Sequence, residues 1–251
     1  ANPEVGSQQT AGGANEPPQE IVTIVADDFI SSRNTANTVV AKEISYDLLR
    51  VLIVSEELAR DPDFIRIIYS ATKDREIKRS AQFIVSRENA ADFIKNNKPK
   101  IETRPHKFLE LMIERGQETG MIPEADLNGF FRVTESDADL YLAIYATTEK
   151  IEKDEAQTTD DDLLAGEIQV EGTTNNAQFI GSAVFKEGKM IGRITGEETR
   201  ISSLLDNTWT TEDILTAFKD PFNERYKLSI RVSQKRENKY KLIHSKGRPT
   251  I

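Results

Sequence analysis

The stretch 178–205 constrains the fold most, because it encodes two strands and a helix in direct succession. Residues 179–185 are largely apolar at both odd and even positions, which is typical of a strand covered on both faces. The sequence KEGK at 186–189 then predicts a hairpin turn in which Gly188 adopts a positive φ. Residues 190–194 form the expected return strand, where Gly192 leaves room for a bulge or a close backbone neighbour.

A helix is expected directly after this hairpin. Thr195 and Glu198 have the spacing of a capping box, in which each side chain bonds a free backbone N–H of the first turn. The expected apolar face of the helix consists of Ile201, Leu204 and Leu205. We expect Phe185, at the end of the first strand, to pack beneath this face.

The hairpin also resembles a turn unit of the Ger(x)C family, the lipoprotein subunits of spore germinant receptors, with the pattern G-x-A-V-F-K-x-x-K-x-x-G. The matching residues are Gly181, Ala183, Val184, Phe185, Lys186, Lys189 and Gly192, followed by Glu197, Glu198 and Thr199. A second segment, RVLIVSEELA at 50–59, resembles the strand-to-helix segment of that family's first domain. Both segments occur in the family's order, so the resemblance covers nearly the whole chain.

The resemblance implies a non-enzymatic lipoprotein subunit of a nutrient germinant receptor. Such a subunit would assemble with the receptor's membrane subunits and support spore germination. It would lie at the outer face of the spore's inner membrane, held by an N-terminal lipid anchor. The sequence starts at Ala1 and contains no cysteine to acylate, so we expect a soluble fragment of a longer, anchored parent.

Composition excludes several classes of function. The net charge of −9 argues against a broad nucleic-acid interface, which needs a basic balance. The absence of cysteine excludes disulfides, cysteine-based zinc sites and cysteine nucleophiles. No apolar run approaches the roughly 18 residues of a membrane span.

The first hundred residues are expected to alternate strands with helices, which predicts a sheet with helical cover. The expected strands are 21–26, 48–54 and a segment within 77–85, and the expected helices start at 27–28, 55–56, 61–62 and 89. The strand at 48–54 reads as central, because it is apolar on both faces except at Arg50. Ser55 is expected to cap the helix that follows. Glu56 and Glu57 are expected to stabilise the first turn of that helix. We do not expect them to act together as catalytic acid and base, because side chains of adjacent helical residues point about 100° apart.

The rest of the chain predicts a mixture of elements. We expect helices at 106–115, after Asp126 and at 212–218, and strands at 139–146, 164–172, 226–232 and 239–243. Gly116 and Gly120 are expected to end the first of these helices. Two low-complexity stretches, 2–19 and 149–162, lack core-forming residues and are expected to be mobile.

These elements predict an α+β protein with mixed sheets and flanking helices. We expect an N-terminal β-α repeat domain at 1–102 and a second α+β domain with the central hairpin at 103–220. Residues 221–251 read as the start of a truncated third domain.

No residue is predicted to be catalytic, cofactor-binding or metal-binding. His106 and His244 are the only histidines, and neither has a second histidine or a cysteine at metal-binding spacing. No nucleophile elbow or phosphate-binding loop occurs. Two alternatives stay open, a small-molecule domain that binds the germinant itself and, more remotely, a hydrolase. The basic residues at 235–248 fit either a solvated hairpin face or contact with anionic lipid.

Overall fold

In the computed structural model of the chain, the described residues are 21–26, 29–73, 76–100, 102, 104–136, 140–151, 163–171, 175–206, 208, 213–219, 225–231, 243–245 and 248–250. The stretch 2–19 expected to be mobile, residues 152–162 of the expected mobile stretch 149–162, the helix start at 27–28 and most of the basic tail lie outside them.

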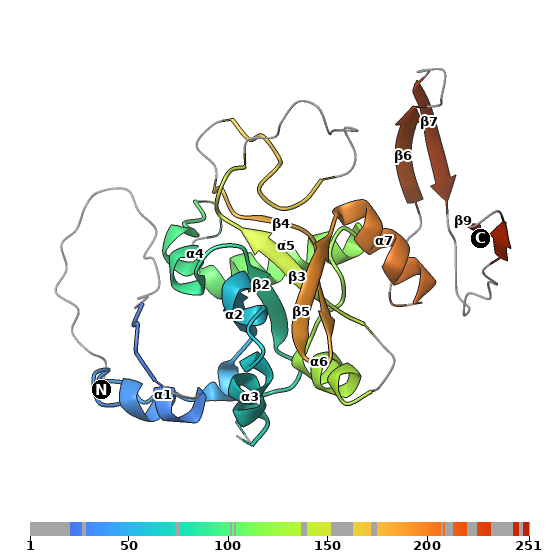
Figure 1. The fold of residues 1–251 in the computed structure, drawn as a ribbon. Coiled ribbons are helices and arrows are strands. Elements are labelled where there is room, and N and C mark those ends of the chain that lie inside the picture. The colour runs from blue at the N-terminus through green and yellow to red at the C-terminus, as the bar shows by residue number, and fades with distance from the viewer. Residues whose placement is uncertain are drawn as a thin grey trace.

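A five-stranded mixed sheet forms the centre of the fold (Figure 1). Its strands, in spatial order, are β1 (Val51–Ser55), β2 (Gln82–Ser86), β3 (Tyr141–Thr147), β4 (Gln178–Lys186) and β5 (Lys189–Ile194). The first three strands run parallel, and β4 and β5 are antiparallel to their neighbours. Two further hairpins pair β6 (Asp213–Lys219) with β7 (Arg225–Arg231) and β8 (Ile243–Ser245) with β9 (Arg248–Thr250).

Helices cover both faces of this sheet, which confirms the predicted α+β class. They are α1 (Phe29–Ala36), α2 (Glu56–Ala59), α3 (Phe64–Tyr69), α4 (Ala90–Asn96), α5 (Pro105–Glu118), α6 (Leu127–Thr134) and α7 (Gly196–Leu205), with 3-10 turns at Tyr46–Leu48 and Ser70–Lys73. In Figure 1, α2 lies in front of the sheet and α5 passes behind it.

An aromatic cluster fills the core between the sheet and helices α3 and α6. Its members are Phe64, Phe83, Phe130, Tyr141 and Phe185, whose ring centroids lie 4.9–6.5 Å apart in successive contacts. All five side chains are buried. Rings at these spacings add edge and stacking attraction to the burial of apolar area.

The hairpin and helix predicted at 178–205 are confirmed. Eight of the nine residues of β4 are buried, as expected of a strand covered on both faces. The turn places Gly188 at φ 77°, and Ile191 bulges out beside Gly192 as the register shifts. Thr195 and Glu198 form the expected capping box of α7.

The predicted apolar face of α7 is wrong. Its buried residues are Gly196, Thr199 and Ser203, whereas Ile201 is 53% exposed. A Cβ at Gly196 would lie 2.7 Å from Ile180, so the helix backbone approaches β4 closely. The hydroxyls of Ser182 and Thr199 lie 2.8 Å apart and hydrogen-bond in this contact. Small residues therefore form the packing face, because larger ones would hold the helix away from the strand.

The expected partner of Phe185 is also corrected. Its side chain is 1% exposed, as predicted, but it contacts Phe64, Phe83 and Phe130 rather than the residues of α7. Neighbouring residues of a strand point to opposite faces, so Phe185 cannot share the face on which Ser182 meets α7.

Two predictions for the early chain are wrong. Residues 21–26 form no strand, and Val25 is 96% exposed, because no neighbouring strand among the described residues supplies hydrogen bonds to the segment. β1 is an edge strand rather than a central one, and its residues are only half-buried apart from Val54. Helices α1 to α4 do lie near their expected positions, with Ser55 and Asn89 as N-caps of α2 and α4.

Later predictions need three corrections. Residues 164–171 form no strand, because a turn at 165–166 interrupts them, in which Gly166 takes φ 97° and leaves the extended conformation. The described part of the helix expected at 212–218, residues 213–218, belongs to strand β6 instead, because it pairs with β7 along its whole length. Helix α5 continues through Gly116 and stops before Gly120, which has φ 71°. The helix after Asp126 and the strands near 139–146 and 226–232 are confirmed.

The central sheet takes strands from both sides of residue 102. β1 and β2 precede this position, and β3 to β5 follow it, with β3 hydrogen-bonded to β2 in parallel. The division at 102 and at 220 stays a prediction.

Candidate functional site

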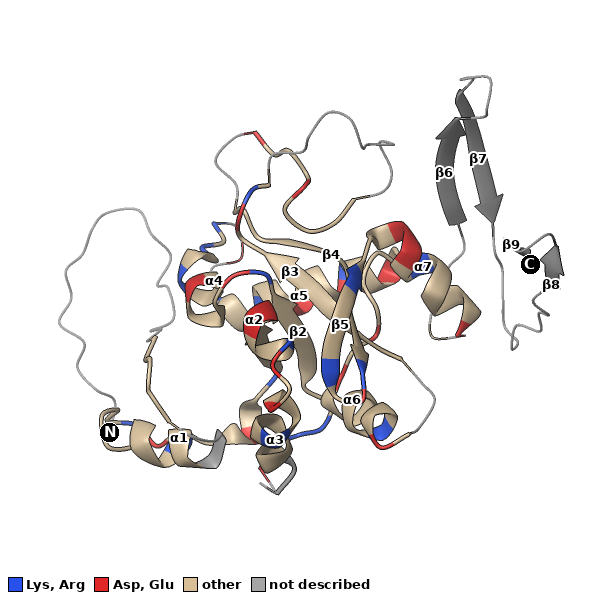
Figure 2. Cartoon of the chain, viewed as in Figure 1, with Lys and Arg blue, Asp and Glu red and all other residues tan. Residues whose placement is uncertain are grey.

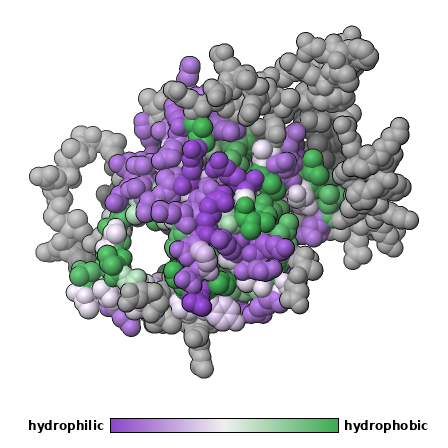
Figure 3. Space-filling model, viewed as in Figure 1, coloured by the Kyte–Doolittle hydropathy of each residue, from purple (hydrophilic) through white to green (hydrophobic). Residues whose placement is uncertain are grey.

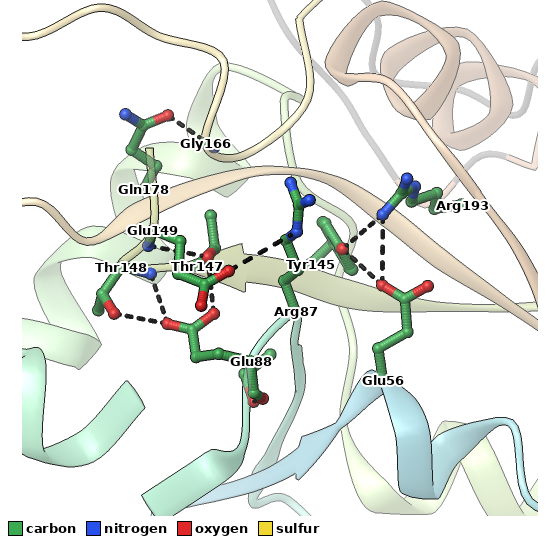
Figure 4. A network of polar contacts seen from close by, with 11 residues as sticks. Glu56, Arg87, Glu88, Tyr145, Thr147, Thr148, Glu149, Gly166, Gln178 and Arg193 are labelled. Atoms are coloured by element: carbon green, nitrogen blue, oxygen red, sulfur yellow. Dashed lines mark hydrogen bonds and ion pairs between the residues drawn. The ribbon is translucent and has the colours of Figure 1, made fainter. Parts of the chain in front are cut away.

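Polar side chains gather where the parallel strands β1, β2 and β3 end (Figure 4). Glu56 follows β1, Glu88 follows β2, and Thr148 follows β3. Ligands of open parallel sheets bind beyond the carboxyl ends of the strands, so this edge is the first place to look for chemistry.

Glu56, Tyr145 and Arg193 form one half of this network. The Tyr145 hydroxyl donates to a carboxylate oxygen of Glu56 at 2.6 Å and accepts from the Arg193 guanidinium at 3.0 Å. The same guanidinium lies 3.4 Å from Glu56 and 5.8 Å from the centroid of the Tyr145 ring. Arg60 donates to the second carboxylate oxygen of Glu56. The triad therefore links the end of β1 to β3 and β5, across the width of the sheet.

The triad shifts the pKa values of its members. Burial opposes ionisation of Glu56, but hydrogen bonds from Tyr145 and Arg60 and the charges of Arg193 and Arg60 outweigh it, so the pKa of Glu56 lies below its ordinary value of 4.5. Burial, together with the adjacent Glu56 carboxylate, raises the pKa of Tyr145. At neutral pH the triad is therefore an ionised carboxylate, a neutral phenol and a guanidinium cation.

Tyr145→Phe should lower the free energy of unfolding by about 1–2 kcal/mol at neutral pH, because it removes the hydroxyl between two charged groups. The folded-state pKa of Glu56 is depressed, so its contribution exists above the unfolded pKa and disappears as pH falls through the folded pKa. The difference between the two proteins should therefore shrink in acid. Urea unfolding near neutral pH and again well below the ordinary pKa of glutamate measures it.

Tyr69→Phe is the matched control, because the Tyr69 hydroxyl donates to Glu135 at an exposed site. It should cost less than half as much as Tyr145→Phe. An equal loss in both variants, or a Tyr145→Phe loss that does not change with pH, would contradict the stabilising role of the triad.

Glu88 forms the other half of the network and is 9% exposed. Its carboxylate accepts from the Thr147 hydroxyl at 2.6 Å, from the Thr148 backbone N–H at 2.6 Å and from the Thr148 hydroxyl at 2.5 Å. The Thr147 oxygen accepts in turn from the backbone N–H of Glu149. Glu88 thus holds the chain as it leaves β3.

Gln178 fixes a neighbouring loop to the first residue of β4. Its side-chain oxygen accepts from the backbone N–H groups of Gly166 and Ile168, and its amide nitrogen donates to the Ile168 carbonyl. These bonds supply the partners that a flanking strand would otherwise give to residues 164–168.

The polar groups of this network already have hydrogen-bond partners within the chain. Both carboxylates and both threonine hydroxyls have partners within the chain. Ser182, which lies within the hairpin pattern between Gly181 and Ala183, is paired with Thr199 rather than with a base. Within the described part of the chain, no group of acidic residues and histidines has the geometry to hold a metal ion. The arrangement ties strand ends together, and it offers no nucleophile with an adjacent base.

A groove of about 540 Å³ opens at the opposite end of β2 and β3. It lies between the loop before α6, α6 itself, the start of β3 and the C-terminal end of α7. The residues that line it include Gln117, Glu124, Asp126, Asn128, Arg132, Leu140, Tyr141, Ser203 and Asp206. Among the described lining residues, Tyr141 is the only aromatic one, and its hydroxyl already donates to the Asp126 carbonyl.

The sequence predicted only part of these sites. Ser55 caps α2 with Glu56 and Glu57 in the first turn, as expected. The bonds that Tyr145 and Arg193 donate to Glu56 were not predicted. Arg193 is 137 positions away from Glu56 in the chain, so no local pattern connects them. The groove was also missed, because it is formed by segments that are distant in the sequence.

Comparison with known proteins identifies two matching families. The family described as "Spore germination protein N-terminal domain" matches residues 1–147. The family described as "Spore germination B3/ GerAC like, C-terminal" matches residues 180–251. The solved structure described as "Crystal Structure of the GerBC protein" aligns with a TM-score of 0.41 and 19% identity, over 80% of this chain and 49% of that chain. The chain thus spans about half the length of GerBC. No curated protein matches the sequence.

Proposed function

The chain belongs to the Ger(x)C family of spore germination proteins, and we propose that it is the C subunit of a nutrient germinant receptor and acts by assembly, without catalysis. The observation that carries this proposal is the pair of family matches, which lie in order along the chain. In this proposal the subunit lies at the outer face of the spore's inner membrane, held by an N-terminal lipid anchor.

The geometry of the polar network supports a role without catalysis. Its carboxylates are held by two or more donors each, so they stabilise strand ends. A catalytic carboxylate needs a free lone pair within reach of a substrate proton. Glu56 and Glu88 direct theirs at residues of the same chain.

The visible surface fits a partner that is contacted through modest patches. In Figure 3, apolar residues form several separate patches on the face shown, divided by hydrophilic surface. The exposed apolar residues include Leu140, Ile191 and Ile201, which come from different elements. Within the described residues, no helix is both long and apolar enough to cross a membrane. Contact with membrane subunits uses surface complementarity, over an area on the order of 1,000 Å².

Co-purification tests the proposed assembly. The receptor's two membrane subunits are co-expressed, solubilised in detergent and mixed with this chain carrying an affinity tag. We expect both membrane subunits to be retained with the chain. A tagged, unrelated acidic domain of similar size is the control. Retention no greater than with that control would contradict assembly through this part of the protein.

A further inference from the structure

The groove at the amino end of β3 contains a buried polar atom without a partner. Ser203 lies in the last turns of α7, and its side chain is on the packed face of that helix. The residue is 3% exposed, and among the described residues its hydroxyl oxygen has no hydrogen-bond partner. Buried hydroxyls are almost always hydrogen-bonded, so an unpaired one that lines a groove indicates a missing acceptor or donor.

The charges along the groove are mostly negative. Among its described lining residues, Glu124, Asp126 and Asp206 supply three carboxylates, against the one guanidinium of Arg132. Figure 2 shows acidic residues at both ends of α7, and Asp206 is the residue that caps its C-terminal end. The partial negative charge of a helix C-terminus adds to that of Asp206. The potential in the groove therefore favours a cationic group.

Two of these carboxylates are available to a partner. Asp126 is engaged as the N-cap of α6, where it accepts from the Gly129 N–H at 2.7 Å. Glu124 and Asp206 are exposed, and within the described residues neither makes an ion pair or a side-chain hydrogen bond. Apolar contact is offered at the rim by Leu140, which is 56% exposed. The groove thus combines two free carboxylates, one buried hydroxyl and an apolar rim.

We propose that this groove is the surface through which the chain docks a Lys- or Arg-bearing polypeptide segment of a membrane subunit. The inference rests on the proposed function, which supplies the class of partner. The cationic side chain lies between Glu124 and Asp206, an apolar neighbour covers Leu140, and a backbone group of the segment pairs with the Ser203 hydroxyl. The volume of about 540 Å³ accommodates a few side chains of such a segment.

Charge-neutralising variants test the electrostatic part. The double variant Glu124→Gln, Asp206→Asn is called the groove variant. It should bind the detergent-solubilised membrane subunits about tenfold more weakly than the unsubstituted chain, which is called the parent chain. The matched control is Glu57→Gln, Glu171→Gln, which removes two exposed carboxylates outside the groove and should bind like the parent. Raising the salt concentration should weaken the parent and the control more than the groove variant.

Ser203→Ala tests the hydroxyl independently of charge. In the free protein the substitution removes an unsatisfied buried group, so the urea midpoint should be unchanged or higher. Binding to the membrane subunits should nevertheless weaken by about fivefold, the usual loss of one hydrogen bond. A purely structural serine would give the opposite pattern, lower stability with unchanged binding, and would overturn this part of the inference.

Photo-crosslinking locates the partner segment. A photoreactive amino acid at Leu140 should crosslink to a membrane subunit, at a peptide that contains Lys or Arg. The same group at Ile94, which is exposed on α4, is the control and should not give that peptide.

The outcomes separate this inference from the proposed function. If the parent chain retains the membrane subunits and the groove variant retains them equally well, the groove is excluded and the assembly stands. A crosslinked peptide without Lys or Arg also overturns the inference. If the parent chain retains neither subunit, the proposed function itself fails. Saturable binding of a nutrient in calorimetric titration, lost in the groove variant, would overturn the inference. It would show instead that the groove binds a small molecule.

Discussion

Phe185→Ala should lower the free energy of unfolding by about 3–5 kcal/mol, the largest effect expected of any single substitution considered for this chain. Phe185 is 1% exposed and contacts the rings of Phe64, Phe83 and Phe130. Truncation removes the buried ring and leaves a cavity between β4, α3 and α6. Because these elements are held by the sheet register and by each other, they cannot close the cavity fully. A shift in the urea midpoint at an unchanged slope measures the loss.

Ile191→Ala in the same hairpin is the matched control. Ile191 bulges out of β5 and is 53% exposed, so its truncation should cost less than about 1 kcal/mol. If Phe185→Ala proves too unstable to purify, Phe185→Leu keeps most of the apolar volume and should lose a smaller amount. Equal urea midpoints for the Phe185 and Ile191 variants would place Phe185 outside the core.

Glu88→Ala should cost roughly 3 kcal/mol, because one buried carboxylate satisfies three donors. The substitution leaves the Thr148 N–H and the hydroxyls of Thr147 and Thr148 without their acceptor. All three lie at buried positions, so water cannot replace the carboxylate without opening the structure. Amide hydrogen exchange should accelerate most at Thr148 and along the end of β3.

Glu171→Ala is the control for this loss, because Glu171 is exposed. The free energy of unfolding of this variant should stay within about 0.5 kcal/mol of that of the unsubstituted chain. A Glu88→Ala protein as stable as this control would show that water or a rearranged loop replaces the carboxylate. Faster exchange throughout the sheet, rather than at the end of β3, would mean that Glu88 supports the whole fold.

Local signals in the sequence predicted the central hairpin correctly. The turn at Gly188 and the capping box of Thr195 and Glu198 depend on residues within a few positions of each other. Ser55 and Asp126 likewise act on backbone N–H groups three residues away. Such signals are strong because backbone geometry and hydrogen bonding are decided within one turn.

The predictions that were wrong concern elements whose structure depends on contacts with segments distant in the sequence. Residues 21–26 have the composition of a strand, but a strand also needs a neighbour, and the sequence does not reveal one. The short apolar segment 212–218 fits a helix or a strand, and its pairing with β7 selects the strand. The face of α7 was assigned to its largest apolar residues, whereas close approach to β4 requires Gly196 and Ser203 to face inward.

The candidate sites were hidden from sequence analysis for the same reason. Glu56 was expected to favour a helix N-terminus, and it does, but its contact with Arg193 depends on the order of the strands in the sheet. Ser203 is one of two adjacent serines in a helix, and nothing in the sequence marks its hydroxyl as buried and unpaired. Only the folded arrangement of α6, β3 and α7 brings it to a groove.

Calorimetric titration of the isolated chain with amino acids, sugars and nucleosides is the most direct test of the proposed function. It tests whether the chain acts by contact with other subunits and does not bind nutrient itself. The account predicts heats of dilution only, because the described network is engaged with its own side chains and the groove is assigned to a polypeptide. Saturable binding of one nutrient at micromolar strength would contradict the account. It would identify the chain as the small-molecule binding domain of the receptor.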